Sequence, residues 1–172
     1  MESRVKLFGH PVHPMLIAFP IGLLAKSLIM DILYLITRNT LLTTASYYMI
    51  AAGIIGGLLA AIFGFIDWLG LPGDSRAKRI GGWHGIGNFT IVVLFIISWF
   101  LRRGDPNFVP GGFALLLSIV GIGMALVTAW IGGELVYRLG VAVDPGANVN
   151  APSSLTEPSA TGTSQAKRTA NR

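Results

Sequence analysis

Four long, nearly uncharged apolar stretches constrain this chain more than any other feature of its sequence. They cover residues 14–37, 41–71, 83–101 and 111–139. The hydrocarbon core of a bilayer is about 30 Å thick, and a helix of about 20 apolar residues crosses it. No stretch shows the alternation of a membrane β-barrel strand, and lipid leaves every backbone polar group to be satisfied within the protein. The pattern therefore predicts four transmembrane helices.

The composition excludes a water-soluble enzyme and a soluble nucleic-acid-binding domain. Of the 172 residues, 52% are hydrophobic and only 12% are charged, which is about half the charged share of a typical soluble domain. The chain contains no cysteine, so it has no disulfide framework, thiolate metal site or iron–sulfur cluster. We expect an all-α integral membrane four-helix bundle over residues 1–143, with the lipid bilayer and no nucleic acid as its partner.

The composition changes sharply after Val143. Residues 144–172 are rich in alanine, serine, threonine, asparagine, proline and glycine, and they contain no aromatic residue. Such a segment cannot bury enough apolar surface to offset the conformational entropy that folding would cost. We therefore predict a disordered C-terminal tail that follows the fourth span.

The distribution of lysine and arginine predicts the orientation of the bundle. Nine of these residues lie at the N-terminus, in the loop after the second span, or at and beyond the end of the fourth span. The opposite side carries Arg38, Arg102 and Arg103, and Lys26 lies within the first span. Basic loops stay in the cytoplasm. We expect a bacterial inner-membrane protein with both termini cytoplasmic and with its first span retained.

Ionisable side chains in or beside the spans are the candidates for function, because such groups are costly in lipid. They are His10, His13, Lys26, Asp31, Asp67, His84 and Glu134. The predicted topology brings all three histidines and two of the acids, Asp67 and Glu134, to one level at the cytoplasmic end. Four different helices supply them, so the sequence predicts a shared polar cluster there.

Helical phase indicates which of these side chains point inward. His84 shares a helix face with Asn88, and His13 shares one with Asp31, because successive residues rotate by about 100°. We expect Asp31 and Asn88 to be structural polar residues inside the bundle. Lys26 points elsewhere, and the sequence assigns it no role beyond ion pairing or reaching toward the membrane surface.

Three kinds of chemistry fit a histidine and carboxylate cluster in a membrane. His13, His84, Asp67 and Glu134 are predicted as ligands of a transition metal, since imidazole and carboxylate are common metal ligands. His10, His13 and His84 are predicted as cofactor ligands, and two of them on facing helices would suit haem b. A proton relay is the third interpretation, because histidines and acids in contact titrate near neutral pH.

A purely structural interpretation stands beside these. The run from His10 to Pro14 is a rigid entry into the first helix, Glu134 and Arg138 form an i,i+4 ion pair, and Asp67 pairs with loop arginines. Small-residue rows in the second and fourth spans mediate helix contacts within the bundle, or form the face of a homodimer. The chain would then be a non-catalytic structural or assembly subunit.

Two further features of the sequence bear on its function. Each predicted hairpin begins with a histidine and ends with an acid, from His13 to Asp67 and from His84 to Glu134, which suggests a parallel repeat about the membrane normal. No P-loop, nucleophile elbow, zincin motif or Rossmann fingerprint occurs, so no catalytic residue is predicted.

Several motifs together resemble a known bacterial family. The motifs are Gly9-His10-Pro11-Val12-His13-Pro14, Phe19-Pro20-Ile21-Gly22, Asp31, Gly64-Phe65-Ile66-Asp67-Trp68, His84 and Gly132-Gly133-Glu134-Leu135-Val136-Tyr137-Arg138-Leu139-Gly140. Over about residues 8–143 the chain resembles the predicted membrane proteins of domain-of-unknown-function family 2231. The resemblance implies a four-helix membrane protein without an assigned activity or catalytic residues. Related domains occur joined to Rieske or cytochrome modules, which implies a redox-linked role and a redox-protein partner.

Overall fold

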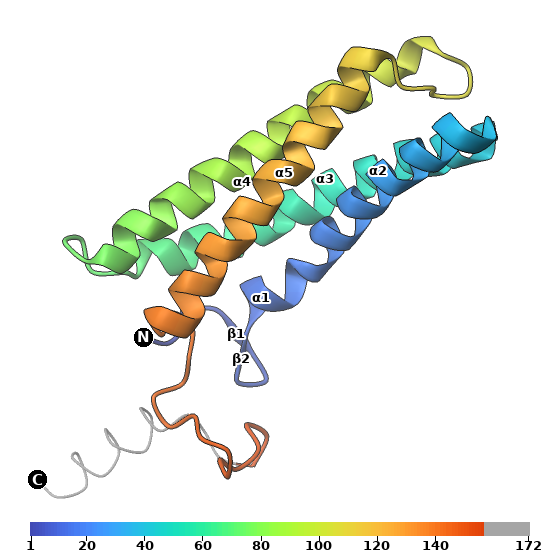
Figure 1. Ribbon diagram of the computed structural model, residues 1–172. Coiled ribbons are helices and arrows are strands. Elements are labelled where there is room, and N and C mark those ends of the chain that lie inside the picture. Colours follow the sequence, from blue (N-terminus) through green and yellow to red (C-terminus); the bar gives the residue numbers. More distant parts are fainter. Residues whose placement is uncertain (157–172) are drawn as a thin grey trace, which may run out of the picture.

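The computed structural model describes residues 1–156, which form a bundle of long helices (Figure 1). The helical elements are α1 (Val12–Leu16), α2 (Ala18–Thr37), α3 (Thr40–Leu69), α4 (Arg76–Leu101), η1 (Arg102–Gly104), α5 (Gly112–Gly133) and η2 (Glu134–Arg138). Within this described part, four helices are long and apolar enough to cross a membrane, the first joining α1 with α2 and the last joining α5 with η2. The predicted all-α, four-span architecture is confirmed. Residues 157–172 of the predicted tail lie outside the described residues.

Polar side chains cap two of the helices in the segments between the predicted spans. Asn39 Oδ1 accepts a hydrogen bond from the Leu41 N–H at 3.0 Å, and Ser75 Oγ accepts one from the Lys78 N–H at 3.0 Å. Such caps satisfy amide groups that a helix start would otherwise leave without a partner. The Ser75 cap lets α4 begin at Arg76, about two turns before the apolar stretch of the third span.

The helices form two antiparallel hairpins, α2–α3 and α4–α5, which pack against each other (Figure 1). The N-terminus, a small antiparallel pair of strands and the segment after η2 gather where α1 and α4 begin. These strands are β1 (Lys6–Leu7) and β2 (His10–Pro11). We call this end of the bundle the histidine end and the opposite one, where α2 and α4 finish, the far end.

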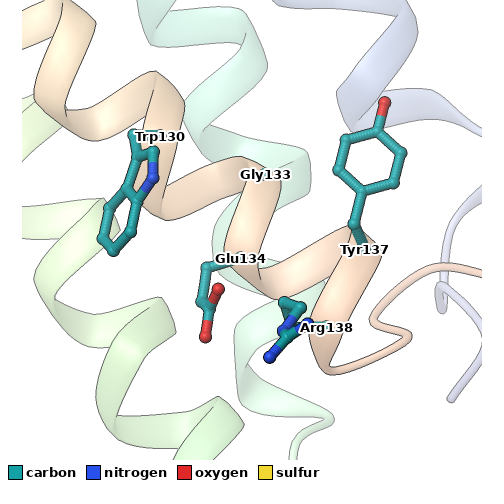
Figure 2. Close-up of a pocket in the computed structure, with 5 residues that line it drawn as sticks. All are labelled: Trp130, Gly133, Glu134, Tyr137 and Arg138. Carbon is teal, nitrogen blue, oxygen red and sulfur yellow. The ribbon is translucent and has the colours of Figure 1, made fainter.

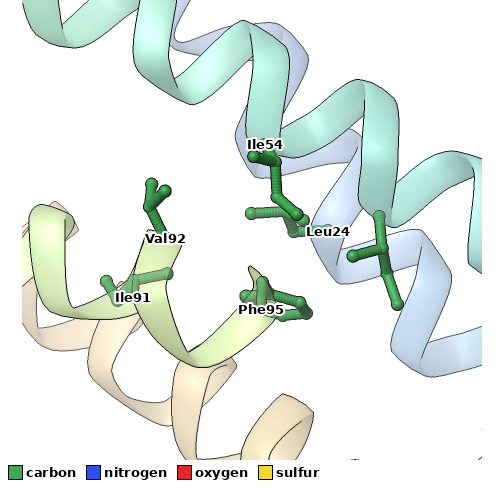
Figure 3. Close-up of a cluster of buried hydrophobic side chains, with 6 residues drawn as sticks. Leu24, Ile54, Ile91, Val92 and Phe95 are labelled. Carbon is green, nitrogen blue, oxygen red and sulfur yellow. The ribbon is translucent and has the colours of Figure 1, made fainter. Parts of the chain in front are cut away.

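A compact core lies between the hairpins. Its six buried side chains, drawn in Figure 3, are Leu24, Ile50, Ile54, Ile91, Val92 and Phe95. Two glycines let the helices of each hairpin approach closely. A Cβ atom on Gly53 would lie 2.6 Å from the Leu24 side chain, and one on Gly121 would lie 2.8 Å from Phe95. Since lipid is as apolar as this core, close van der Waals packing is what joins the helices, and these small residues serve contacts inside each hairpin.

Large apolar side chains cover the outside of the bundle. Among the most exposed are Ile36, Leu41, Phe89, Leu126 and Trp130. An apolar surface of this extent would cause aggregation in water. It matches the acyl chains of a bilayer, so the surface and the four spans together indicate a membrane protein.

Candidate functional site

Two histidines from different hairpins meet at the histidine end. His13 lies in α1 and His84 lies in the third turn of α4. Their ring centroids are 6.4 Å apart, and the ring planes cross at 86°. Both residues are half-buried. Helices from the two halves of the chain therefore place one imidazole each at the same level of the bundle.

His13 is held by the neighbouring helix α3. Its Nδ1 atom lies 2.8 Å from the carbonyl oxygen of Ala60. A carbonyl oxygen can only accept, so Nδ1 carries the proton and Nε2 keeps its lone pair. The ring lies against Gly64, where a Cβ atom would come within 2.8 Å of His13 Cε1. A glycine at this position therefore lets the imidazole pack directly against the backbone of α3.

His84 is held by α5 in the corresponding way. Its Nδ1 donates to the carbonyl oxygen of Thr128 at 3.0 Å, and a Cβ atom on Gly132 would lie 3.1 Å from His84 Cε1. Asn88, a predicted structural polar residue, adds a contact that His13 lacks. Its Nδ2 donates to the His84 carbonyl oxygen at 2.8 Å and lies 3.2 Å from His84 Nε2.

The two hairpins correspond position by position. In the first helix of each hairpin, equivalent positions are 71 residues apart, as in the pairs His13/His84, Leu24/Phe95, Ser27/Ser98 and Asp31/Arg102. In the second helix they are 68 residues apart, as in Ser46/Ala114, Gly53/Gly121, Ala60/Thr128 and Gly64/Gly132. The buried residues of α2 and of α5 all have buried equivalents in the other half. The chain therefore contains a parallel repeat of one helical hairpin.

A buried ion pair joins the two halves at the far end. Arg102 donates from Nη1 to Asp31 Oδ1 at 2.8 Å and from Nη2 to Oδ2 at 2.6 Å. Neither side chain has any exposed surface. Arg102 also contacts the hydroxyl groups of Ser46, Ser98 and Ser118 at 3.2 to 3.4 Å. All four long helices thus supply groups to this pair, which fits the inward position predicted for Asp31.

The sequence interpretation missed Arg102, although a signal for it was present. Arg102 follows His84 by the same 18 residues by which Asp31 follows His13. Eighteen residues are five helical turns, so an arginine there shares the inward face of His84. Because Arg102 follows the apolar stretch, the sequence analysis counts it only among the basic residues outside the spans. Lys26, in contrast, is exposed on α2 and makes no hydrogen bond or ion pair with the residues that the structure describes.

The predicted acids do not join the histidine pair. Asp67 accepts hydrogen bonds from Ser3 Oγ at 2.8 Å and from the Arg4 N–H at 2.7 Å. Glu134 instead forms an ion pair with an arginine of α4 at 2.8 Å. His10 is exposed, and its Nε2 lies 3.3 Å from the hydroxyl of Ser154. Across residues 1–156 no group of three or more histidine, aspartate or glutamate side chains is placed to hold a metal ion. The expected five-residue cluster is therefore reduced to a pair of histidines.

The expected ion pair between Glu134 and Arg138 is wrong. Glu134 binds Arg76 of α4, and Arg138 makes no hydrogen bond or ion pair with the described residues. Glu134 and Arg138 lie in η2, a π-helical turn in which the Leu139 N–H donates to the Glu134 carbonyl at 3.1 Å. The reason for the different partner is that α4 packs against η2 and brings Arg76 Nη2 within 2.8 Å of Glu134 Oε1.

A pocket of about 260 Å³ lies against η2 and is shown in Figure 2. It is lined by Trp130, Gly133, Glu134, Tyr137 and Arg138. Trp130 and Tyr137 are 72% and 88% exposed, so the pocket opens on the outside of the bundle. It contains neither histidine of the pair, and the candidate site is therefore the pair itself.

Comparison with known proteins identifies a family. No curated protein and no solved structure matches the chain. The model of a family described as a predicted membrane protein, domain of unknown function 2231, matches residues 9–145. The matched region contains both histidines of the pair, the carbonyl groups that bind them, and the Asp31–Arg102 ion pair. The chain therefore belongs to the DUF2231 family of predicted membrane proteins.

Proposed function

We propose that this chain is a membrane-embedded module that binds a metal-containing cofactor through His13 and His84. One observation carries the proposal. The two rings come from different hairpins, lie 6.4 Å apart, and each use Nδ1 to bind a backbone carbonyl. A histidine that ligates a metal typically donates its other ring N–H to a carbonyl or carboxylate, which fixes the ring and raises its basicity. The Nε2 lone pair is then the ligand atom.

The partners of the Nε2 atoms support this assignment. Within residues 1–156, His13 Nε2 has no hydrogen-bond partner. His84 Nε2 has only the Asn88 amide at 3.2 Å, which is a long contact for a hydrogen bond. Polar side chains in a membrane domain are costly and usually functional. Two imidazoles with available lone pairs at one level of the bundle therefore suit metal coordination better than they suit helix packing alone.

The proposal also includes a cellular location and a membrane orientation. We infer a bacterial inner-membrane protein whose histidine end faces the cytoplasm, because basic residues concentrate there and basic segments stay inside. By the elements that carry or flank them, those at the histidine end are Arg4, Lys6, Arg76, Lys78, Arg79 and Arg138. A redox-protein partner on that side and a homodimer remain predictions from the sequence.

The test is the metal content of the purified full-length chain. The protein is expressed in cells supplied with haem precursor and transition metals, purified in detergent, and analysed for bound metal per chain. We expect about one metal per chain in the native protein and a loss of about tenfold or more in His13→Ala and His84→Ala. His10→Ala is the matched control, because His10 is exposed and lies outside the pair.

A structural role is the second candidate, and a specific observation favours it. Both Nδ1 hydrogen bonds join helices within one hairpin, so each histidine would stabilise its hairpin even without a cofactor. If the native protein is free of metal, and the two alanine variants only lower the melting temperature, then the pair is structural and the cofactor proposal fails.

A further inference from the structure

We infer that the cofactor is a haem, held by His13 and His84 as the two axial ligands of its iron. This inference rests on the proposed function and specifies it. The sequence left open a bare metal ion, a haem and a proton relay. The geometry of the described residues distinguishes these three by the number of donors, by their separation and by the packing around them.

The number of protein donors favours a porphyrin over a bare ion. A bare transition-metal ion in a protein takes four or more ligands, and at least three of them usually come from side chains. The described part of the chain offers no group of three such donors. The acids expected to complete a metal site are bound elsewhere, Asp67 to Ser3 and Glu134 to Arg76. A haem supplies four nitrogen ligands itself, so two imidazoles complete its coordination.

The separation of the rings suits a single iron between them. Metal–nitrogen bonds of about 2 Å on both sides of one ion, together with the radius of each ring, place two imidazole centroids about 6 Å apart. The observed separation is 6.4 Å. The ring planes cross at 86°, and the backbone carbonyls of Ala60 and Thr128 hold this orientation. A porphyrin plane would be shared by the two halves of the repeat, with each half supplying one ligand.

Packing at the histidine end differs from packing in the rest of the bundle. The core lies in the middle, and the ion pair and its serines are fully buried at the far end. At the histidine end Ala60, Thr128 and Leu135 are also buried, but no residue is buried in α1, in residues 61–69 of α3, or in residues 76–90 of α4. Gly64 and Gly132 draw the imidazoles against α3 and α5. These three segments beside the imidazoles therefore leave more surface uncovered than the core does, at the level where a flat, largely apolar ring would lie.

Two axial imidazoles have a chemical consequence. They fill both remaining coordination positions of the iron and leave none for a substrate. The expected absorption spectrum is accordingly that of six-coordinate, low-spin haem. A proton relay would give no visible absorption, and a bare metal ion would give no porphyrin after extraction.

The test measures porphyrin separately from metal on the same full-length preparation. We expect one haem per chain in the pyridine haemochromogen assay, and the absorption spectrum of low-spin haem. Both the haem and the spectrum should be lost in His13→Ala and in His84→Ala. Both should be retained in His10→Ala. In case the alanine variants fold poorly, His13→Gly and His84→Gly are purified with free imidazole. Imidazole should restore the spectrum, because it replaces the missing ligand.

The outcomes distinguish this inference from the proposed function. Bound metal without porphyrin, lost in both histidine variants, would overturn the haem and leave the metal-binding function intact. A preparation without either metal or porphyrin would overturn both. Haem that persists in both histidine variants would show that its ligands lie elsewhere and would also overturn the inference.

Discussion

At the scale of single residues, the two histidines are equivalent in position but differ in one neighbour. His84 Nε2 lies beside the Asn88 amide, whereas the equivalent neighbour of His13 is Ile17. The Asn88 orientation follows from its contact with the carbonyl oxygen of His84, which can only accept and lies 2.8 Å from Asn88 Nδ2. Asn88 therefore competes with a metal for the His84 lone pair.

Replacing Asn88 tests this competition. A hydrogen bond of about 1 kcal/mol corresponds to about a fivefold change in affinity. We expect Asn88→Leu to bind added cofactor about fivefold more tightly in a titration of the cofactor-free protein. Thr90→Ala is the control, because the Thr90 hydroxyl donates only to the Ile86 carbonyl of its own helix. Weaker binding by Asn88→Leu would mean that Asn88 orients His84 and does not compete for it.

The residues that sequence reasoning placed well are those whose position depends on helix geometry. The common level of His13 and His84 follows from the start points of two spans, and the inward position of Asp31 follows from its phase with His13. The partner of a flexible side chain does not follow in this way. Glu134 pairs with Arg76 of α4, a residue 58 positions earlier in the chain, and no local pattern in the sequence predicts a contact between such distant residues.

At the scale of elements, the N-terminal segment closes the histidine end. The Met1 ammonium group donates to the Gly140 carbonyl at 2.9 Å, and the Ala142 N–H donates to the Met1 carbonyl at 2.8 Å. Asp67, at the end of α3, binds Ser3 and the backbone of Arg4. Asp67 therefore attaches the segment before α1 to the end of the first hairpin, next to the helix that carries His13.

Removing the Asp67 carboxylate should release this segment. Asp67→Ala leaves the Ser3 hydroxyl and the Arg4 N–H without their acceptor, at a cost of about 1–3 kcal/mol. We expect a melting temperature lower by about 2–10 °C and faster proteolysis within residues 1–11. Asp74→Asn is the control, since Asp74 is exposed and has no partner among the described residues. Unchanged proteolysis would show that other contacts hold the segment.

The existence of the four helices followed from apolar length, because lipid permits few alternatives for an uncharged stretch. Their ends were less predictable. Two polar turns of α4 precede its apolar stretch and depend on the Ser75 cap. The strands β1 and β2 are too short to produce a periodic pattern of hydrophobic residues in the sequence. When the start of an element depends on a cap or a turn, hydropathy does not locate its first residue.

At the scale of the whole molecule, the repeat explains why two different contacts join the halves. When two similar hairpins pack about a shared axis, equivalent residues lie opposite each other near that axis. His13 faces His84 at one end, and Asp31 faces Arg102 at the other. The sequence suggested a repeat only through its histidines and acids. Equivalent positions are often buried in both halves but are occupied by different residue types, as Leu24 and Phe95 are.

The Asp31–Arg102 pair makes the association of the two halves specific. Two copies of the first hairpin packed in this way would place aspartate against aspartate, and two copies of the second would place arginine against arginine. An unpaired or like-charged contact at a site without exposed surface is strongly destabilising. We therefore expect that Arg102→Asp and Asp31→Arg each cost about 3–5 kcal/mol and lower the melting temperature by about 10 °C.

Restoring opposite charge should recover much of this loss. In the double variant, Asp31→Arg with Arg102→Asp, an ion pair forms again in the reverse sense, so its melting temperature should exceed that of either single reversal. The matched control reverses Arg76 and Glu134, a pair whose arginine side chain is 55% exposed and whose contribution should be at most about 1 kcal/mol. A double variant no more stable than the single reversals would contradict the argument. The three serines, arranged around the arginine that follows α4, would then set the pairing, and the charges would not.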